Sequence, residues 1–304
     1  MGAALVLRRS EGPLRVARPC PRPGTEAAKA SPRPRRPDRA RDLSAYPNVY
    51  EAAFSWDRSR EARTYLRVAA ARLGRPPGSG VELACGSGPI AGLWASWGID
   101  AFGVDRSARA IARARERTRG LVPTRQWVLG DLRTFRLPRR VELAVVPMDA
   151  LGYLVEEEDL LAFFRTAGRC LARGGILAAD LTLHPERGPP LPVRNAWEVS
   201  LRPQGNLRVR WHSQGRAWGS PLRQWEVAKI TVRVPGRPRR IYWECFPHAA
   251  IRAAALGDVS RRAGGLGPMW VYSDAAHRDR SSRLRPVSKL DRALGPRLVC
   301  WQRD

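Results

Sequence analysis

Two hydrophobic rhythms alternate between residues 48 and 183. Segments with helical spacing are separated by short apolar runs of the length of buried strands. The pattern predicts helices over residues 48–73, 90–97, 108–119 and 157–171, and strands over 81–84, 101–104, 126–129, 141–146 and 175–181. Strands that alternate with helices in this way favour an α/β fold, with a parallel sheet covered on both faces.

After His184 the pattern changes to tryptophan-rich stretches with alternating charged residues. Three or four antiparallel strands are expected, over residues 197–201, 207–211, 225–234 and 241–246. Five of the eleven tryptophans fall here, so we expect one aromatic face to be buried against the main body or over a cleft. A helix over 247–263 and strands over 269–273 and 297–301 are expected to close the chain.

The first 44 residues contain seven prolines, and 11 basic residues against 4 acidic ones. Such a segment is expected to be disordered and to lie outside the fold. It is either a basic arm for nucleic acid or the product of a start site assigned too far upstream. The expected organisation is therefore this N-terminal segment (1–44), a core (45–185), an antiparallel β insert (186–246) and a C-terminal helix with a closing hairpin (247–304).

Composition excludes several classes of protein. No apolar run approaches the roughly 18 residues of a membrane span, and residues 1–15 lack the features of a signal peptide or a myristoylation site. The five cysteines and four histidines are widely spaced, which predicts neither a disulfide framework nor a metal site. We expect a protein of the reducing cytoplasm, without a membrane partner.

The net charge of +26 raises the possibility of an acidic partner. The excess is uneven: residues 45–185 hold 20 basic and 15 acidic residues, whereas residues 186–304 hold 23 and 9. Because 51 of the 54 basic residues are arginines, the first explanation of the excess is the arginine codons of a GC-rich genome, ahead of a selected basic surface. Both interpretations remain open.

The segment from Val81 to Ala91 reads as a strand, a Gly86-Ser87-Gly88 turn and a helix. The glycines let a ligand approach the backbone, and the helix N-terminus offers free N–H groups. Asp105 ends the next predicted strand, where its carboxylate can accept hydrogen bonds from both hydroxyls of a ribose. These features predict a cofactor of the adenosine type.

Three further positions distinguish this turn from a dinucleotide site, whose G-x-G-x-x-A pattern it also fits. Glu82, inside the first strand, would repel a pyrophosphate and is suited to a polar turn or an amino group. Asp131 ends the third strand, where it can accept from the adenine amine. Residues 147–151 follow the fourth strand, at the carboxyl edge where open α/β sheets bind ligands.

With these residues the chain resembles the class I S-adenosylmethionine-dependent methyltransferases, especially bacterial members with a small-molecule-type catalytic domain. The resemblance covers residues 46–183; residues 82–88, 103–107, 130–132 and 171–175 match family motifs in order. It implies a Rossmann-like, seven-stranded sheet with helices on both faces, a small antiparallel insert before the last two strands that covers the substrate, and S-adenosylmethionine as cofactor.

The resemblance also implies roles for individual residues. Gly86 and Gly88 would form the floor under the methionine part, and Asp105 would hold the ribose. Arg106 would flank the adenine, whose edge Asp131 and the Leu132 backbone would read. The other implied cofactor-binding positions are Glu82 and Ala84 in the first motif, the Pro147 carbonyl facing the methionine amino group, and Tyr50, with Trp56, closing over the cofactor.

Methyl transfer from a sulfonium is an in-line displacement, so alignment and exclusion of water are the main tasks of the enzyme. A general base is needed only if the acceptor must lose a proton. The candidates are Asp149, Tyr153, His212, Glu244 and His248, of which Asp149 and His212 are the two assigned here. His248 follows Pro247 at an expected helix start, where it would act as a cap. We expect the acceptor to be an O or N atom of a small molecule.

Two alternatives stay open. The basic C-terminal half suggests an RNA or other nucleic-acid methyltransferase, although residues 147–150 lack both the Asn/Asp-Pro-Pro-aromatic box of amino-directed base methyltransferases and the Pro-Cys pair of cytosine C5 enzymes. A non-catalytic binding module on the same fold would use the arginine-rich sheet to hold RNA or a protein.

Overall fold

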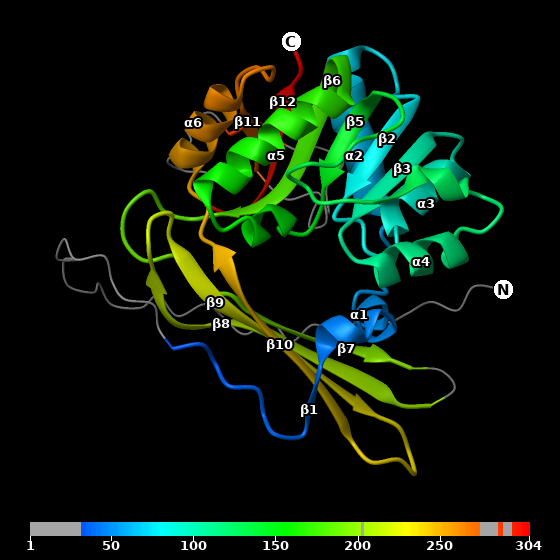
Figure 1. Ribbon diagram of the computed structural model, residues 1–304, viewed down its shortest axis with the longest axis vertical. Helices are drawn as coiled ribbons and strands as arrows, with labels where there is room; N and C mark the ends of the chain where they lie inside the picture. Colours follow the sequence, from blue (N-terminus) through cyan, green and yellow to red (C-terminus); the bar gives the residue numbers. More distant parts are fainter. Residues whose placement is uncertain (1–31, 202–203, 274–284, 288–293) are drawn as a thin grey trace. The chain divides into compact units, whose positions relative to one another are not determined.

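The computed structural model describes residues 32–201, 204–273, 285–287 and 294–304 (Figure 1). These residues divide into two compact units. The β unit comprises the described residues up to Trp56 together with Arg187–His248, and the core unit comprises Asp57–Glu186 and Ala249–Asp304. Each unit has its own sheet.

The core unit is built on a seven-stranded sheet of order β11-β12-β6-β5-β2-β3-β4. The strands from β4 to β6 are parallel neighbours, and β12 and β11 add antiparallel pairs at one edge. This confirms the predicted Rossmann-like fold class. The elements are α2 (Ser59–Leu73), β2 (Ser79–Leu83), α3 (Pro89–Ser96), β3 (Asp100–Asp105), α4 (Ala108–Arg117), β4 (Trp127–Leu129), β5 (Val141–Val146), α5 (Glu157–Cys170), β6 (Leu171–Leu183), α6 (Ala253–Ala263), β11 (Trp270–Tyr272) and β12 (Gly295–Gln302).

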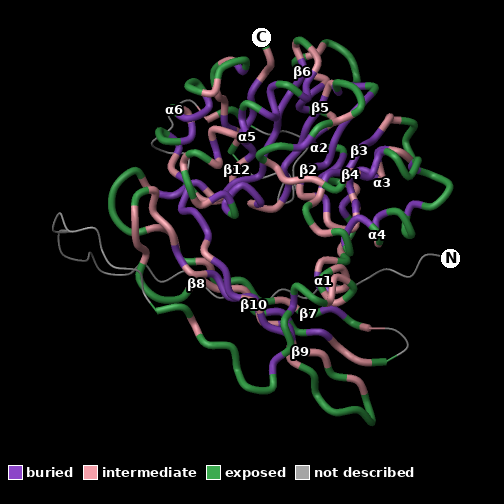
Figure 2. The backbone as a smooth tube through the Cα atoms, viewed as in Figure 1, coloured by how far each residue is buried: buried purple, intermediate pink, exposed green. Residues whose placement is uncertain are grey.

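The continuous apolar runs of the parallel strands are explained by burial on both faces of the sheet, visible as purple strands in Figure 2. Val146 and Leu143 of β5 belong to different hydrophobic clusters. The first cluster contains Phe163 and Phe164 of α5, and the second contains Trp94 of α3. The two clusters pack on opposite faces of the sheet and hold its strands in place. They therefore also position the edge formed by the carboxyl ends of the parallel strands.

The β unit contains a five-stranded sheet of order β1-β10-β9-β8-β7. Strand β8 pairs antiparallel with both β7 and β9, whereas β1 runs parallel to β10. The elements are β1 (Ala40–Asp42), α1 (Pro47–Ala53), β7 (Arg194–Ser200), β8 (Asn206–Trp218), β9 (Arg223–Arg233) and β10 (Arg240–Ala249). One face of this sheet packs on α1 through Val199, Leu207 and Ala53.

The expectation that residues 1–44 lie outside the fold is wrong for their last part. Residues 1–31 are outside the described range, but residues 40–42 form β1, and Leu43 is only 1% exposed. A three-residue strand has no readable periodicity, and its backbone hydrogen bonds to β10 are made with residues some 200 positions away. Sequence pattern alone could not reveal it.

The boundary of the core also differs from the expected residue 45. Residues 45–56 cluster with the β unit, because Phe54 packs on Trp197 and Trp211 of that sheet, with ring centroids 5.3 and 5.9 Å apart. The helix predicted over 48–73 is accordingly two helices, α1 and α2. Asp57 precedes the second helix and accepts a hydrogen bond from the Ser59 N–H at 2.8 Å, while Arg58 occupies the N-cap position.

Candidate cofactor-binding site

The turn after β2 is held in left-handed backbone conformations, with φ of 51° at Ala84, 54° at Gly86 and 67° at Gly88. The two glycines serve different purposes. A Cβ on Gly88 would overlap the ring of Trp127, whereas a Cβ on Gly86 would meet no atom within 4 Å. Gly88 is therefore required by packing, and Gly86 leaves open space in which a ligand can approach the backbone.

Glu82 lies beneath this turn and is 1% exposed. Its Oε2 accepts hydrogen bonds from the N–H groups of Ile90 (3.0 Å) and Ala91 (2.8 Å), in the first turn of α3. Burial raises the pKa of Glu82 to about 8, although these two donors and Arg58 oppose the shift. Glu82 thus joins β2 to α3, which is one of the two roles that the sequence offered for it. Its implied contact with the cofactor stays a prediction.

Asp105 at the end of β3 lies beside the glycine turn, as predicted. Its Oδ2 accepts from the Gly86 N–H and its Oδ1 from the Ser107 N–H, both at 2.8 Å. Because each carboxylate oxygen has a further lone pair, both remain able to accept from a hydroxyl. The turn and the carboxylate are therefore fixed together at the carboxyl edge of β2 and β3.

Asp131 is engaged in a way that the sequence analysis missed. Its Oδ1 accepts from the backbone N–H and Nε of Arg133, and its Oδ2 accepts from Nη2, each at 2.8 Å. Arg133 also donates to Asp159 at 3.0 Å. Hydrogen bonding from Arg133 holds the pKa of Asp131 below its usual value, and the nearby charge of Arg106 acts in the same direction. An adenine amine at Asp131 would therefore meet a carboxylate that is already oriented and ionised.

The segment after β5 contains two consecutive non-glycine residues in left-handed conformations, Met148 (φ 56°) and Asp149 (φ 60°). The Asp149 N–H donates to the Asp180 carbonyl at 3.0 Å, and the Pro147 carbonyl accepts from the Ala150 N–H at 3.3 Å. Strained backbone of this kind persists where the surroundings enforce it, commonly at ligand sites. Asp149 is thus held at the edge of the sheet where we expected it.

A buried ionic cluster lies behind this segment. Arg58, 6% exposed, donates through Nε and Nη2 to the Glu61 carboxylate, and its Nη1 lies 3.1 Å from Met148 Sδ. Tyr65 donates its O–H to Asp180 at 2.8 Å. Sequence reasoning missed this cluster; its one local signal is the i,i+3 spacing of Arg58 and Glu61 at a helix start.

Tyr50, Trp56 and His212 belong to the β unit, so their proposed roles toward the cofactor or the acceptor stay predictions. Tyr50 stacks on Phe54, with ring centroids 4.4 Å apart. His212 lies on β8 opposite Val227 of β9. It is therefore on the other face of the sheet from its chain neighbour Trp211.

The expectation that His248 caps a helix is wrong, because β10 continues to Ala249 and α6 begins only at Ala253. His248 is instead buried, with Nδ1 3.4 Å from Glu226 Oε1. Glu226 also accepts from Trp211 Nε1 at 2.6 Å. This pairing could not be predicted from the sequence, because the two residues are brought together only by the sheet.

Within the described residues, no group of three or more His, Cys, Asp or Glu side chains is arranged to hold a metal ion. No helix in the same ranges has the length and apolar character needed to cross a membrane.

Comparison with known proteins agrees with this geometry. Residues 81–175 match the family model of a methyltransferase domain. No curated protein sequence matches the chain.

Three solved structures share the fold. Streptomyces venezuelae DesVI is 19% identical, with a TM-score of 0.64, over 85% of this chain and 98% of that one. The S-adenosylmethionine-bound amino pentose methyltransferase CalS10 of Micromonospora echinaspora is 18% identical, with a TM-score of 0.59, over 86% of this chain and 97% of that one. The sugar N-methyltransferase KedS8 of Streptoalloteichus sp. is 17% identical, with a TM-score of 0.61, over 91% of this chain and 99% of that one. Residues 81–175 thus match a methyltransferase domain, and the chain shares the fold of these solved structures.

Proposed function

We propose that the protein transfers the methyl group of S-adenosylmethionine to an O or N atom of a small-molecule acceptor. The observation that carries the proposal is the pairing of Gly86 with Asp105. The glycine leaves open space over the backbone, and its N–H fixes a carboxylate that retains acceptor capacity. This pairing suits a ribose held against a close backbone turn.

The surrounding residues fit the rest of the cofactor. Asp131, oriented by Arg133, would accept from the adenine amine, with the Leu132 backbone and Arg106 beside it. Arg58, a buried cation in contact with Met148, would provide positive potential for the methionine carboxylate at the end of β5. The Pro147 carbonyl would accept from the methionine amino group.

When bound, the cofactor supplies a methyl group already activated on a sulfonium. The residues of the chain therefore need to bind, orient and exclude water rather than activate a leaving group. The Asp149 N–H donates to the Asp180 carbonyl, which holds the backbone at this position in place. We assign to Asp149 the acceptance of a proton from the acceptor, where the acceptor must lose one.

For the acceptor we propose a sugar-like molecule with an amine or hydroxyl group. CalS10 is named as an amino pentose methyltransferase, and KedS8 is named as a sugar N-methyltransferase. The β unit carries an aromatic group suited to the apolar faces of a sugar ring: Phe54, Trp56, Trp197, Trp211 and Phe246 are neighbours, with centroids 5.3 to 6.0 Å apart. Glu226 and His248 add hydrogen-bonding groups beside it.

The test begins with calorimetric titration of the full chain with S-adenosylmethionine and with S-adenosylhomocysteine at one salt concentration. A methyl-transfer assay with labelled cofactor, amino sugars, neutral sugars and RNA follows. Micromolar binding of both cofactor forms and labelling of a sugar would support the proposal. Labelling of RNA alone would replace it with nucleic-acid methylation, and a folded protein that binds neither form would indicate a non-catalytic module.

A further inference from the structure

Three basic side chains of β8 and β9 share one face of the sheet of the β unit. Residues 187–248 contain twelve basic and three acidic residues. On β8 the side chains of Leu207 and Val209 are buried in the apolar cluster of one face, so Arg208 and Arg210 point to the other. Lys229 shares that outer face, because it lies directly opposite Arg210 in the pairing of β8 with β9.

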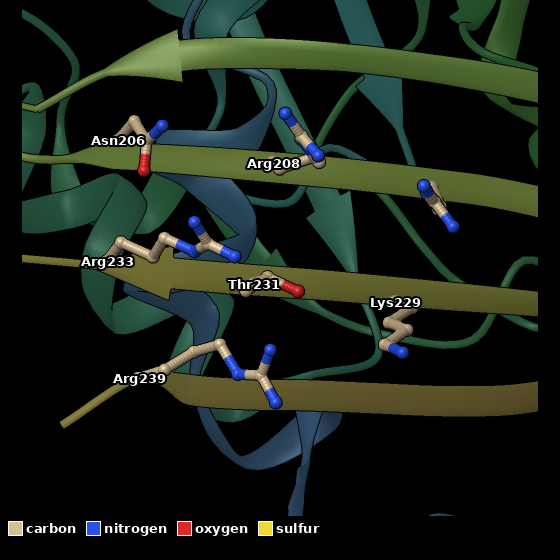
Figure 3. Close-up of a pocket in the computed structure, with 7 residues that line it drawn as sticks. Asn206, Arg208, Lys229, Thr231, Arg233 and Arg239 are labelled. Carbon is tan, nitrogen blue, oxygen red and sulfur yellow. The ribbon is translucent and has the colours of Figure 1, made fainter.

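Seven residues define what we call the basic patch. They come from β8, β9 and the turn before β10, and in Figure 3 they lie on neighbouring strands around a shallow hollow of about 190 Å³. The members are Asn206, Arg208, Arg210, Lys229, Thr231, Arg233 and Arg239. Five carry a positive charge, and the lining contains no carboxylate and no aromatic side chain.

The sheet register places like charges against each other. Arg210 is the direct cross-strand partner of Lys229, and like charges in directly opposite positions destabilise a sheet. Arg208 is compensated by Glu198, with 2.5 Å between Nη2 and Oε1. Within the described residues, Arg210, Lys229, Arg233 and Arg239 make no ion pair with an acidic side chain. The arrangement therefore has an electrostatic cost that an anion would relieve.

The chemistry of the lining narrows the class of anion. Small-molecule sites are mostly apolar and aromatic with few polar groups, and sites for single-stranded nucleic acid use aromatic side chains on which bases stack. The basic patch has neither feature. What it offers is cations distributed over two neighbouring strands and the turn before β10, an arrangement suited to contacting successive phosphates of a backbone without reading bases.

We propose that the basic patch binds the sugar-phosphate backbone of double-stranded nucleic acid, independently of base sequence. The binding is separate from the methyl-transfer site and does not require nucleic acid to be the methyl acceptor. It gives part of the arginine excess of this chain a specific use.

The test is fluorescence anisotropy of the full chain with labelled mixed-sequence duplex DNA, duplex RNA and the corresponding single strands, over a range of salt concentrations. The informative variant is Arg210→Gln/Lys229→Gln. Its matched control is Arg113→Gln/Arg261→Gln, which removes the same charge from two exposed helical arginines of the core unit. Circular dichroism and S-adenosylhomocysteine titration check that each variant is folded.

For the patch variant we expect duplex affinity to fall about tenfold, and the slope of log K against log salt to decrease by about one to two. The control should change affinity less than about twofold. An equal loss in both variants would show a diffuse charge effect and overturn the proposal. Tighter binding of single strands, or displacement of the duplex by inorganic pyrophosphate at comparable concentration, would also overturn it. Cofactor binding is measured separately, by S-adenosylhomocysteine titration. A protein that does not bind the cofactor would therefore contradict the proposed function without bearing on duplex binding by the basic patch.

Discussion

The core unit and the β unit handle charge in opposite ways. In the core unit, Arg58 and Glu61 are buried and paired, and Glu82 is engaged by the N-terminus of α3. In the basic patch, Arg210 and Lys229 are directly opposed without an acidic partner in the described residues. Paired buried charges hold neighbouring groups in one geometry, as a defined cofactor requires. Unpaired surface cations remain available for an anion with no single fixed position.

The backbone shows a related difference. In the described part of the core unit, the non-glycine residues in left-handed conformations are Ala84, Met148 and Asp149, all at the carboxyl ends of β2 and β5. In the described part of the β unit, all positive-φ residues are glycines, including Gly219 and Gly236 in turns. Strain is therefore concentrated where the core is expected to bind its ligand.

The largest expected effect is a loss of stability at Gly88, and a matched glycine distinguishes the contribution of side-chain packing from that of backbone conformation. Gly88→Ala should lower the free energy of unfolding by about 2 to 4 kcal/mol, because the new Cβ overlaps Trp127 as well as straining the backbone. Gly74→Ala is the control: Gly74 has a similar φ of 71° but nothing within 4 Å of its Cβ position. Urea unfolding measures both, and equal losses would mean that the contact with Trp127 is unimportant.

The next effect concerns the carboxylate of Asp105. Asp105→Ala should weaken binding of S-adenosylhomocysteine by about 1.5 to 3 kcal/mol with the fold intact, because hydrogen bonds to a charged group are lost. Asp258→Ala, on the exposed face of α6, should leave affinity unchanged. Calorimetry reads both variants, and unchanged affinity in Asp105→Ala would remove the ribose assignment.

The buried carboxyl of Glu82 predicts a pH dependence of stability. Its pKa of about 8 in the folded protein lies above the ordinary 4.5, so between these pH values the folded state holds a proton that the unfolded chain has lost. Its contribution to stability is therefore complete at low pH and declines as pH rises toward 8, by at most about 1.4 kcal/mol per pH unit.

Glu82→Gln mimics the protonated carboxyl and keeps an oxygen that can accept from Ile90 and Ala91. Thermal unfolding of both proteins between pH 5 and about pH 8 should show a steeper decline for the wild type than for the variant. Parallel curves would show that Glu82 is ionised throughout this range.

The smallest effect tests the like-charge register of the β unit. Lys229→Gln should stabilise the protein without ligand by about 0.2 to 1 kcal/mol, because it removes the repulsion from Arg210. High salt should abolish the difference, since it screens exposed charges. Thermal unfolding at low and high salt measures it, and destabilisation at low salt would contradict the charge argument.

The architecture of the core and the centre of its site could be predicted from the sequence alone. Alternating helices and strands specify a parallel sheet, and successive parallel strands end at one edge, so the turn at Gly86 and the carboxylate of Asp105 had to meet.

Only the tertiary structure decided which residues lie opposite one another. It placed Lys229 against Arg210, His248 beside Glu226, and Arg58 against Met148. These contacts depend on strand register and on packing between segments far apart in the chain. Local hydrophobic periodicity carries no information about either, whereas a glycine turn or a strand end is specified by its immediate neighbours.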